Sequence, residues 1–256
     1  MTTLYTHCDY NLGDNLAHLH YLRKQAVRYA DHHFVHAAKY AHLPQMIEVI
    51  CDIPNISLID ITYKPEHSQD AWKNRDNYFY SHAGWQDYAV FYLDFFRYLS
   101  DKLGLISPFE KAEDLLFDYP AILKTRYAEY DFLVINSAPM SGHFPEFNPA
   151  DFDTLIAALL DRGYSVATTA PSHTNAPCTM NSQLSVTAIG GLSLSCKYIV
   201  GVSTGPSWPT FNIWNKDSVL LRLLLPAQEQ VLIAPNTVHA KTLPEAVEIL
   251  KNRGLL

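Results

Sequence analysis

Several patterns that would point to a common enzyme class are missing from this chain. It has no GxGxxG fingerprint of nicotinamide or flavin dehydrogenases and no GxxxxGKS/T phosphate loop of P-loop NTPases. Its twelve histidines include no HExxH pair and no CxxC combined with HxxxH, which are common spacings of zinc ligands. The sequence therefore counts against both nucleotide-dependent classes, and we expect neither a cofactor nor a bound metal.

Cysteine and long apolar runs are also scarce. The four cysteines, Cys8, Cys51, Cys178 and Cys196, are widely spaced, so we expect reduced and mostly buried thiols. The N-terminus lacks the layout of a signal peptide, and no apolar run reaches the roughly 18–20 residues of a membrane span. We expect a cytoplasmic protein without a transmembrane segment, with peripheral work at a membrane surface left open.

Positive charge is low as well. The formal net charge of −7 argues against a nucleic acid as the main partner, which would require a basic surface. An anionic nucleotide is still compatible, because backbone amides at a helix N-terminus bind phosphate without any net positive charge. With 48% apolar residues, the 256-residue chain can bury a sizeable core, and its length suits two small domains.

The first half of the chain alternates between strand and helix patterns. Apolar residues at Leu16, Leu19, Leu22 and Ala26 recur at spacings of three and four, which predicts a helix that starts at Asp14 or Asn15. The other elements expected are strands at 4–8, 34–36 and 56–61 and a helix at 46–50. This order is typical of βαβ units and a parallel sheet.

The middle of the chain is different. Residues 64–82 are polar and without periodicity, which predicts a long loop of the kind that is often functional. The run 88–103 is helical in pattern and rich in aromatic residues. We interpret it as a core or interdomain packing helix, because aromatic side chains dominate ordinary cores.

A second alternating block begins at Asp131. Asn148 and Pro149 are a typical helix start, and Gly163 a typical helix end. The remaining elements expected are strands at 132–136, 164–168 and 197–202, a loop at 171–182, a helix at 183–195, apolar runs at 218–224 and 231–234, and a last helix opened by a capping box at 242–245. Two such blocks predict a doubly wound protein with domains at 1–128 and 129–256.

Three loops after predicted strands carry candidate functional groups, because ligands in open α/β sheets bind at the carboxyl ends of the strands. In the first, Asn11–Asn15, Gly13 permits a tight turn and Asp14 lies at the mouth of a helix. The Asp14 carboxylate there suits a general base for an acceptor hydroxyl. The spacing alone favours a simple helix cap, which would stabilise the helix by about 1 kcal/mol.

The second loop, Val202–Ser207, offers backbone amides and hydroxyls at a helix start, which suits a diphosphate or is an ordinary strand-to-helix turn. The third loop, Asn136–His143, follows a buried strand and combines small hydroxyl residues with one histidine. His143 suits contact with a phosphate or proton donation, or it is simply a solvated loop residue.

Two stretches of the sequence have a specific arrangement. Gly13-Asp14 leads into the helical run 15–23, and 191–202 places a short helix and an apolar strand before Ser203-Thr204-Gly205-Pro206. In this order they resemble the two signatures of glycosyltransferase family 9, the heptosyltransferases. The loop 136–143 and the following Phe144-Pro145 resemble the interdomain segment of that family. The order and spacing are similar across most of the chain.

The resemblance implies a GT-B-like α/β fold, in which two Rossmann-like domains with parallel sheets face a central cleft. It implies a nucleotide-sugar donor, a glycan or glycolipid acceptor and an inverting, metal-independent transfer. Asp14 would be the catalytic base, and Thr204 and Gly205 would hold the donor diphosphate. The other residues expected on the donor side are Ser137, His143, Ser203 and Pro206, and those expected on the acceptor side are Gly13, Asn15 and His18.

The sequence departs from the family pattern in three places. Ser203 stands where the family has an acidic residue, and no lysine or arginine occurs between Asn136 and Glu146. The histidine that usually follows the Ser/Thr-Gly-Pro segment is also absent. Two other functions therefore stay open: a non-catalytic relative that binds a nucleotide-sugar, and an epimerase of nucleotide-sugars that needs no acceptor.

Overall fold

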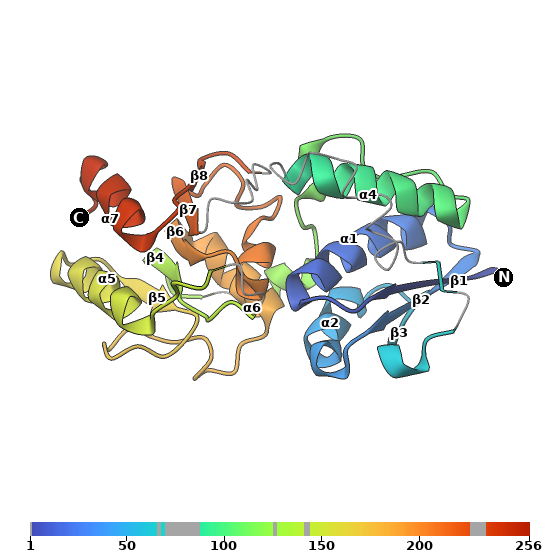
Figure 1. The fold of residues 1–256 in the computed structure, drawn as a ribbon, viewed down its shortest axis with the longest axis horizontal. Helices are drawn as coiled ribbons and strands as arrows, with labels where there is room; N and C mark the ends of the chain where they lie inside the picture. Colours follow the sequence, from blue (N-terminus) through green and yellow to red (C-terminus); the bar gives the residue numbers. More distant parts are fainter. Residues whose placement is uncertain (1, 66–67, 70–87, 125–126, 141–143, 226–233) are drawn as a thin grey trace. The chain divides into compact units, whose positions relative to one another are not determined.

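The computed structural model describes residues 2–65, 68–69, 88–124, 127–140, 144–225 and 234–256 (Figure 1). These residues form an α/β fold with parallel sheets, as the sequence predicts. They divide into two compact units, the first within 1–119 and the second within 120–256. This division falls before the domain boundary that the sequence places after residue 128.

The first unit is built on a parallel sheet whose three described strands lie in the order β1-β2-β3. The register pairs Thr2 with His32 and Cys8 with Ala38, so β1 and β2 run side by side over their whole length. The elements are β1 (Thr2–Cys8), α1 (Leu12–Arg28), β2 (His32–Ala38), η1 (Tyr40–His42), α2 (Leu43–Ile50), β3 (Ile56–Asp60), η2 (Ile61–Tyr63), α4 (Tyr88–Leu103) and η4 (Ala112–Leu115).

Helix α1 begins earlier than the sequence suggests. Its N-cap is Asn11, so Leu12 is the first helical residue and Gly13 lies within the first turn. The helix therefore begins two residues before Asp14, the earlier of the two expected starts. The reason is that Asn11 and Asp14 are both good capping residues, and here they act together at a spacing of three.

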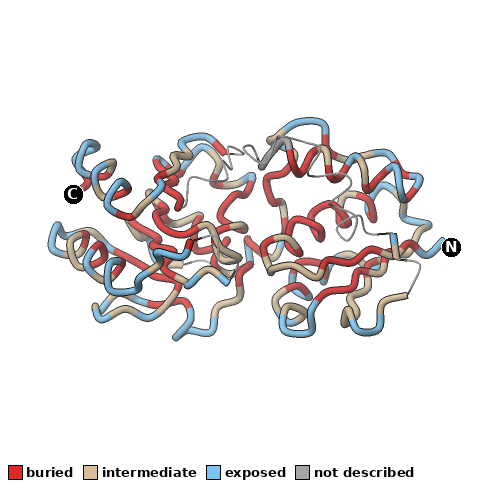
Figure 2. The backbone as a smooth tube through the Cα atoms, in the orientation of Figure 1, coloured by how far each residue is buried: buried red, intermediate tan, exposed pale blue. Residues whose placement is uncertain are grey.

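Helix α4 has the bounds expected for the aromatic helix and packs along α1. Phe96 stacks on Tyr21 with ring centroids 4.9 Å apart, and Phe95 stacks on His18 at 5.1 Å. Figure 2 shows that α1 is buried along most of its length. Phe91, Tyr92, Phe95 and Phe96 of α4 are thus core residues of the first unit. The predicted loop at 64–82 lies mostly outside the described residues.

In the second unit, the described strands form a parallel sheet in the order β5-β4-β6-β7-β8. This is one of the two common doubly wound orders. The elements are η5 (Pro120–Leu123), β4 (Tyr130–Ile135), α5 (Pro149–Asp161), β5 (Val166–Thr168), α6 (Val186–Leu192), η6 (Ser193–Ser195), β6 (Cys196–Val202), η7 (Gly205–Thr210), β7 (Leu221–Leu225), β8 (Thr237–His239) and α7 (Leu243–Asn252).

Both faces of this second sheet are covered by helices. Phe132 and Val134 of β4 share one core cluster with residues of α5 and α7, whereas Leu133 and Ile135 share another with residues of α6. Successive residues of a strand point to opposite faces, so a strand covered on both sides is apolar throughout. That is why 132–135 forms an uninterrupted apolar run.

Most details predicted for this unit are confirmed. Asn148 caps α5, its side chain accepting the Ala150 amide at 3.2 Å, and Gly163 adopts a φ of +84° just beyond the helix. Strand β8 was not expected, and the apolar run at 231–234 lies mostly outside the described residues. The four cysteines are free; three are buried and Cys51 is exposed. No helix among the described residues is long and apolar enough to cross a membrane.

Candidate functional site

Asp14 lies in the first turn of α1, and both of its carboxylate oxygens accept hydrogen bonds. Oδ2 accepts from the backbone amide of Asn11 at 3.2 Å, which completes the helix cap. Oδ1 accepts from the hydroxyl of Tyr92 on α4 at 3.0 Å. Gly13 is buried beside it, whereas Asp14 itself is half-buried. The carboxylate thus caps the helix and is fixed from a second helix, an arrangement compatible with either predicted role.

Asn15 belongs to a buried polar network. Its side-chain nitrogen Nδ2 donates to the Asn11 carbonyl at 2.9 Å, and its side-chain oxygen Oδ1 lies 3.2 Å from Nε2 of His36. Since Oδ1 can only accept, Nε2 of His36 is the donor, and Nδ1 accepts from the Thr6 hydroxyl at 2.8 Å. Burial lowers the pKa of His36 to about 3, so the ring is neutral. A role for Asn15 in acceptor binding stays a prediction.

His18 is a core residue of the first unit. It is 1% exposed, stacks on Phe95 and lies edge-on to His36 at 5.2 Å. Burial, and next the proximity of His36, lower the pKa of His18 well below its ordinary value. The ring is therefore a neutral aromatic group, and its predicted contact with an acceptor also stays a prediction.

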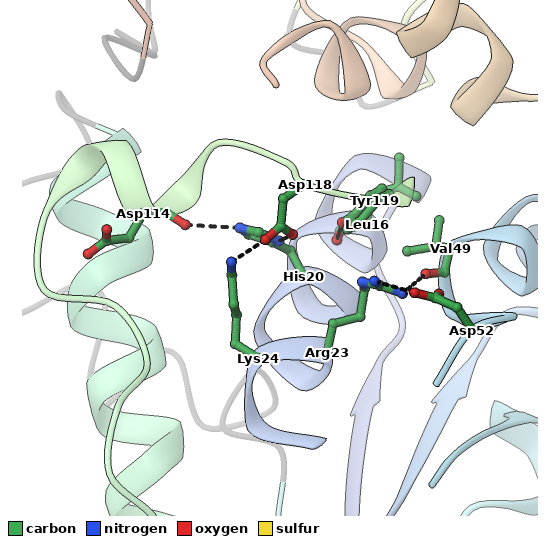
Figure 3. Close-up of polar contacts among 9 residues, drawn as sticks. All are labelled: Leu16, His20, Arg23, Lys24, Val49, Asp52, Asp114, Asp118 and Tyr119. Atoms are coloured by element: carbon green, nitrogen blue, oxygen red, sulfur yellow. Dashed lines mark hydrogen bonds and ion pairs between the residues drawn. The ribbon is translucent and has the colours of Figure 1, made fainter. Parts of the chain in front are cut away.

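A polar cluster holds α1 against η4 and the segment that follows it (Figure 3). Nε2 of His20 donates to the Asp114 carbonyl at 2.9 Å, and Lys24 forms an ion pair with Asp118. Burial lowers the pKa of His20 against the attraction of the Asp118 carboxylate 3.5 Å away. The segment is thereby tied to the same helix that carries Asp14.

Arg23 anchors the other side of α1. Its guanidinium binds both carboxylate oxygens of Asp52, at 2.5 and 2.9 Å, and donates to the Val49 carbonyl at 2.5 Å. The guanidinium carbon also lies 5.6 Å from the ring of Tyr119, whose hydroxyl donates to the Leu16 carbonyl at 2.5 Å. Two-point binding of this kind fixes geometry as well as charge. Helix α1 is thus a rigid support for Asp14.

The two other predicted loops meet at one place in the second sheet. The connection from β4 leads to β5 on one side, whereas the connection from β6 leads to β7 on the other. Ligands of doubly wound sheets bind at such a switch point, at the carboxyl ends of the strands. Here β4 and β6 are direct neighbours, with Ile135 opposite Gly201. The loops that begin at Asn136 and at Ser203 therefore leave adjacent strand ends.

Asn136 joins the loop after β4 to the loop after β5. Its Oδ1 accepts the amides of Thr169 and Ala170 at 3.1 and 2.8 Å, and its Nδ2 donates to the Ala170 carbonyl at 3.0 Å. The Ser137 hydroxyl donates to Oγ1 of Thr169 at 2.8 Å. Thr169 was not predicted as a site residue, because only the fold brings it beside Asn136. His143 lies outside the described residues.

The loop after β6 uses most of its backbone amides internally. The Ser203 amide donates to the Leu225 carbonyl at 2.6 Å, and the Thr204 amide donates to the Ser207 hydroxyl at 3.1 Å. The Ser207 amide returns to the Thr204 carbonyl at 2.8 Å, and Pro206 has no amide hydrogen. The amides of Ser203, Thr204 and Ser207 therefore already have partners within the unit, and the binding of a diphosphate by this loop stays a prediction.

One polar group of this loop, the buried hydroxyl of Thr204, donates no hydrogen bond to any residue in the described part of the chain. A buried polar group without a hydrogen bond costs about 1–3 kcal/mol, so such a group calls for a partner. Thr204 and Gly205 are the two residues to which the family resemblance assigns the diphosphate.

The expectation that the chain holds no GxSxG elbow of an α/β-hydrolase is wrong as to the motif, because Gly201–Gly205 has this pattern. In an elbow, the serine lies on a sharp and strained turn. Ser203 instead extends the pairing of β6 with β7 through its amide, and its φ is not positive. The geometry is therefore that of a continuing strand and does not suit a nucleophilic serine.

A buried network supports the connection between β6 and β7. The Arg222 guanidinium, which is 0% exposed, donates to both oxygens of Asn215 at 2.8 Å and to the Pro235 carbonyl at 3.0 Å. Asn215 in turn donates to the Ser193 hydroxyl at 2.7 Å. Burial lowers the pKa of Arg222 to about 10, which leaves it charged at neutral pH. This network holds the connection that begins with Thr204 and Gly205.

Gly201 allows β6 to lie against β4 at the switch point. Its φ is +146°, and a Cβ there would lie 2.1 Å from the Ile135 carbonyl oxygen. We expect Gly201→Ala to lower the free energy of unfolding by about 3–5 kcal/mol, because a central strand pair must separate. Urea denaturation followed by circular dichroism measures the loss.

Gly163→Ala is the matched control for that variant. Gly163 also has a positive φ, yet a Cβ there would meet nothing within 4 Å. Its replacement should therefore cost only the strain of a left-handed residue, about 1–2 kcal/mol. Equal losses in the two variants would show that the close contact with Ile135 is not the cause.

The fold has solved relatives. It aligns with E. coli heptosyltransferase WaaC, solved with ADP-2-deoxy-2-fluoro heptose, at a TM-score of 0.59 and 12% identity, over 99% of this chain and 100% of that one. It aligns with a family 9 glycosyl transferase from Veillonella parvula at a TM-score of 0.52 and 11% identity, over 99% and 89% of the two chains.

A third relative is the dodecameric, iron-containing heptosyltransferase TibC in complex with ADP-D-beta-D-heptose. The TM-score is 0.54 and the identity 14%, over 93% of this chain and 62% of that one. Neither protein-family models nor curated protein sequences give a match. The chain therefore has the fold of the heptosyltransferases of glycosyltransferase family 9.

Proposed function

We propose that this protein is a glycosyltransferase that moves a sugar from a nucleotide-sugar to an acceptor hydroxyl of a glycan or glycolipid. The observation that carries the proposal is that the loops beginning at Asn136 and at Ser203 leave adjacent strand ends at the switch point of the second sheet. The structures of WaaC and TibC contain an ADP-heptose analogue and ADP-heptose, which supports a donor of this chemical kind.

In this proposal the donor binds to the second unit. The Thr204 hydroxyl and the Gly205 amide donate to the diphosphate. The buried Thr204 hydroxyl supports this assignment, because it donates to no other described residue. Ser203 and Pro206 shape this loop. Ser137 and His143 contact the donor from the neighbouring loop, which follows β4. Neutral donors stabilise a leaving diphosphate if they are fixed in place before the reaction.

Asp14 is the proposed general base, on the acceptor side with Gly13, Asn15 and His18. The carboxylate takes the proton of the acceptor hydroxyl, whose oxygen attacks the anomeric carbon from the face opposite the diphosphate. The bond from that carbon to the phosphate oxygen breaks, and the nucleoside diphosphate leaves with the electron pair. The configuration at the anomeric carbon is thereby inverted. The proposal includes a cleft between the two domains and no metal ion.

A thermal-shift series with ADP, UDP, GDP and CMP tests donor binding. A nucleotide present at 100 times its dissociation constant stabilises the fold by about 2.7 kcal/mol. For a chain of this size we expect the matching nucleotide to raise Tm by roughly 5–10 °C. Thr204→Val should reduce that shift, whereas Thr154→Val, which removes an exposed hydroxyl on α5, should leave it unchanged. A flat response to all four nucleotides would refute the donor site.

A non-catalytic relative is the second candidate, favoured by one observation. Ser203 has no carboxylate to replace the family's acidic residue, and its amide is held in the strand ladder. Such a protein would give the thermal shift without releasing the free nucleotide when a donor and acceptor are supplied together. An epimerase would instead convert the nucleotide-sugar with no acceptor present, so analysis of the products separates all three functions.

A further inference from the structure

Helices α1 and α4 run parallel and meet along one continuous seam. Residues near the N-terminus of α1 contact residues near the N-terminus of α4, and residues near the two C-termini likewise contact each other. From one end to the other, the pairs are Asp14 with Tyr92, His18 with Phe95, Tyr21 with Phe96, and Gln25 with Ser100. The seam therefore sets the position of Tyr92 relative to Asp14 through several independent contacts.

Tyr92 is itself held firmly. It is 2% exposed, and its ring stacks on Phe96 at 5.6 Å and meets Phe91 edge-on at 5.1 Å. Phe96 in turn lies 5.3 Å from Phe109, beyond the end of α4. A buried aromatic ring with neighbours on two sides has little freedom to turn. The Tyr92 hydroxyl therefore reaches Oδ1 of Asp14 from a fixed direction, at 3.0 Å.

We propose that Tyr92 is a positioning residue for Asp14, which holds the carboxylate ionised and turned for proton transfer. The role depends on the proposed function, in which Asp14 is the base. The Asn11 amide holds Oδ2 at 3.2 Å, and the Tyr92 hydroxyl holds Oδ1 at 3.0 Å, so together these two contacts fix the rotation of the carboxylate. A hydrogen bond donated to a carboxylate favours its charged form.

Tyr92→Phe tests this role, because it removes one hydroxyl and keeps the ring in the seam. A hydrogen bond to a charged group contributes about 1.5–3 kcal/mol, which corresponds to about 1–2 pH units. We expect the Asp14 carboxyl to titrate about 1–2 pH units higher in Tyr92→Phe, measured by NMR on protein with 13C-labelled aspartate. The acid limb of the kcat profile should move by the same amount, while KM stays unchanged.

Tyr21→Phe is the matched control. It removes another buried tyrosine hydroxyl from the same seam, one that lies 2.9 Å from the Ser100 hydroxyl and does not involve Asp14. The Asp14 titration should keep its wild-type midpoint in this variant. A midpoint unchanged by Tyr92→Phe, or moved equally by Tyr21→Phe, would overturn the positioning role.

Failure of the proposed function gives a different result. The Asp14 resonance is assigned by its loss in Asp14→Asn, so the titration does not depend on any donor or acceptor. If Asp14→Asn still transfers sugar at the wild-type rate, the general base is elsewhere, and Tyr92 has no base to position. If Asp14→Asn is inactive and Tyr92→Phe keeps the wild-type titration and pH profile, Asp14 is the base and Tyr92 is only a packing residue.

Discussion

Asp14→Asn is expected to lower kcat for sugar transfer by about 10²–10⁴-fold, the usual contribution of a positioned general base. The amide has nearly the shape of the carboxylate but cannot take a proton from the acceptor hydroxyl. KM for the donor should change little, because the proposed donor contacts lie in the second unit. A coupled assay of released nucleoside diphosphate, at saturating donor and acceptor, measures the rate.

The fold should survive this change. An asparagine at the third helical position still accepts the Asn11 amide, and loss of the charge at the helix N-terminus costs about 0.3–1 kcal/mol. Asp114→Asn is the matched control, since the Asp114 carboxylate caps η4 by accepting the Glu110 and Lys111 amides at 2.9 and 3.0 Å. If both variants lose activity equally, the cause is the weakened helix caps and not the loss of a general base.

The sequence alone predicted most of the second unit because its signals are local. The buried strand 132–135 was recognisable as an apolar run, and α5 by its Asn148 cap and a stripe of apolar residues. Strand β8 was missed because three residues, Thr237–His239, are too few to show a period. It exists only through its pairing with β7.

The candidate site was predictable only in part, and for a related reason. The positions of Asp14 and of Ser203–Pro206 follow from short motifs next to strand ends. Tyr92 lies 78 residues from Asp14, and its place within a run of aromatic residues gave no sign that its hydroxyl was used. The sequence likewise gives no sign that the Ser203 and Thr204 amides donate hydrogen bonds within the unit, because Leu225 and Ser207 become their partners only in the folded chain.

The buried histidines of the first unit are expected to make the fold unstable in acid. His18, His20 and His36 are each at most 1% exposed, and burial is the main cause that lowers the pKa of all three. The unfolded chain takes up these protons near pH 6.5, whereas the folded chain does so only at lower pH. Stability is therefore complete above pH 6.5 and falls as the pH drops below it.

Each proton bound only by the unfolded chain costs about 1.4 kcal/mol per pH unit, so three histidines cost about 4 kcal/mol per unit. Between pH 6.5 and 5 the loss is at most about 6 kcal/mol, which matches the lower end of the 5–15 kcal/mol typical of a domain. Urea unfolding at pH 7, 6 and 5 measures the slope before most carboxylates titrate.

His18→Phe, which keeps an aromatic ring against Phe95, should reduce this slope by about a third. His173→Gln should leave it unchanged, because the His173 side chain is 95% exposed. A slope near zero in the parent protein would mean that protons reach these histidines without unfolding. The first unit would then open locally around α1, the helix that carries Asp14, and the fixed geometry inferred for that carboxylate would not hold in acid.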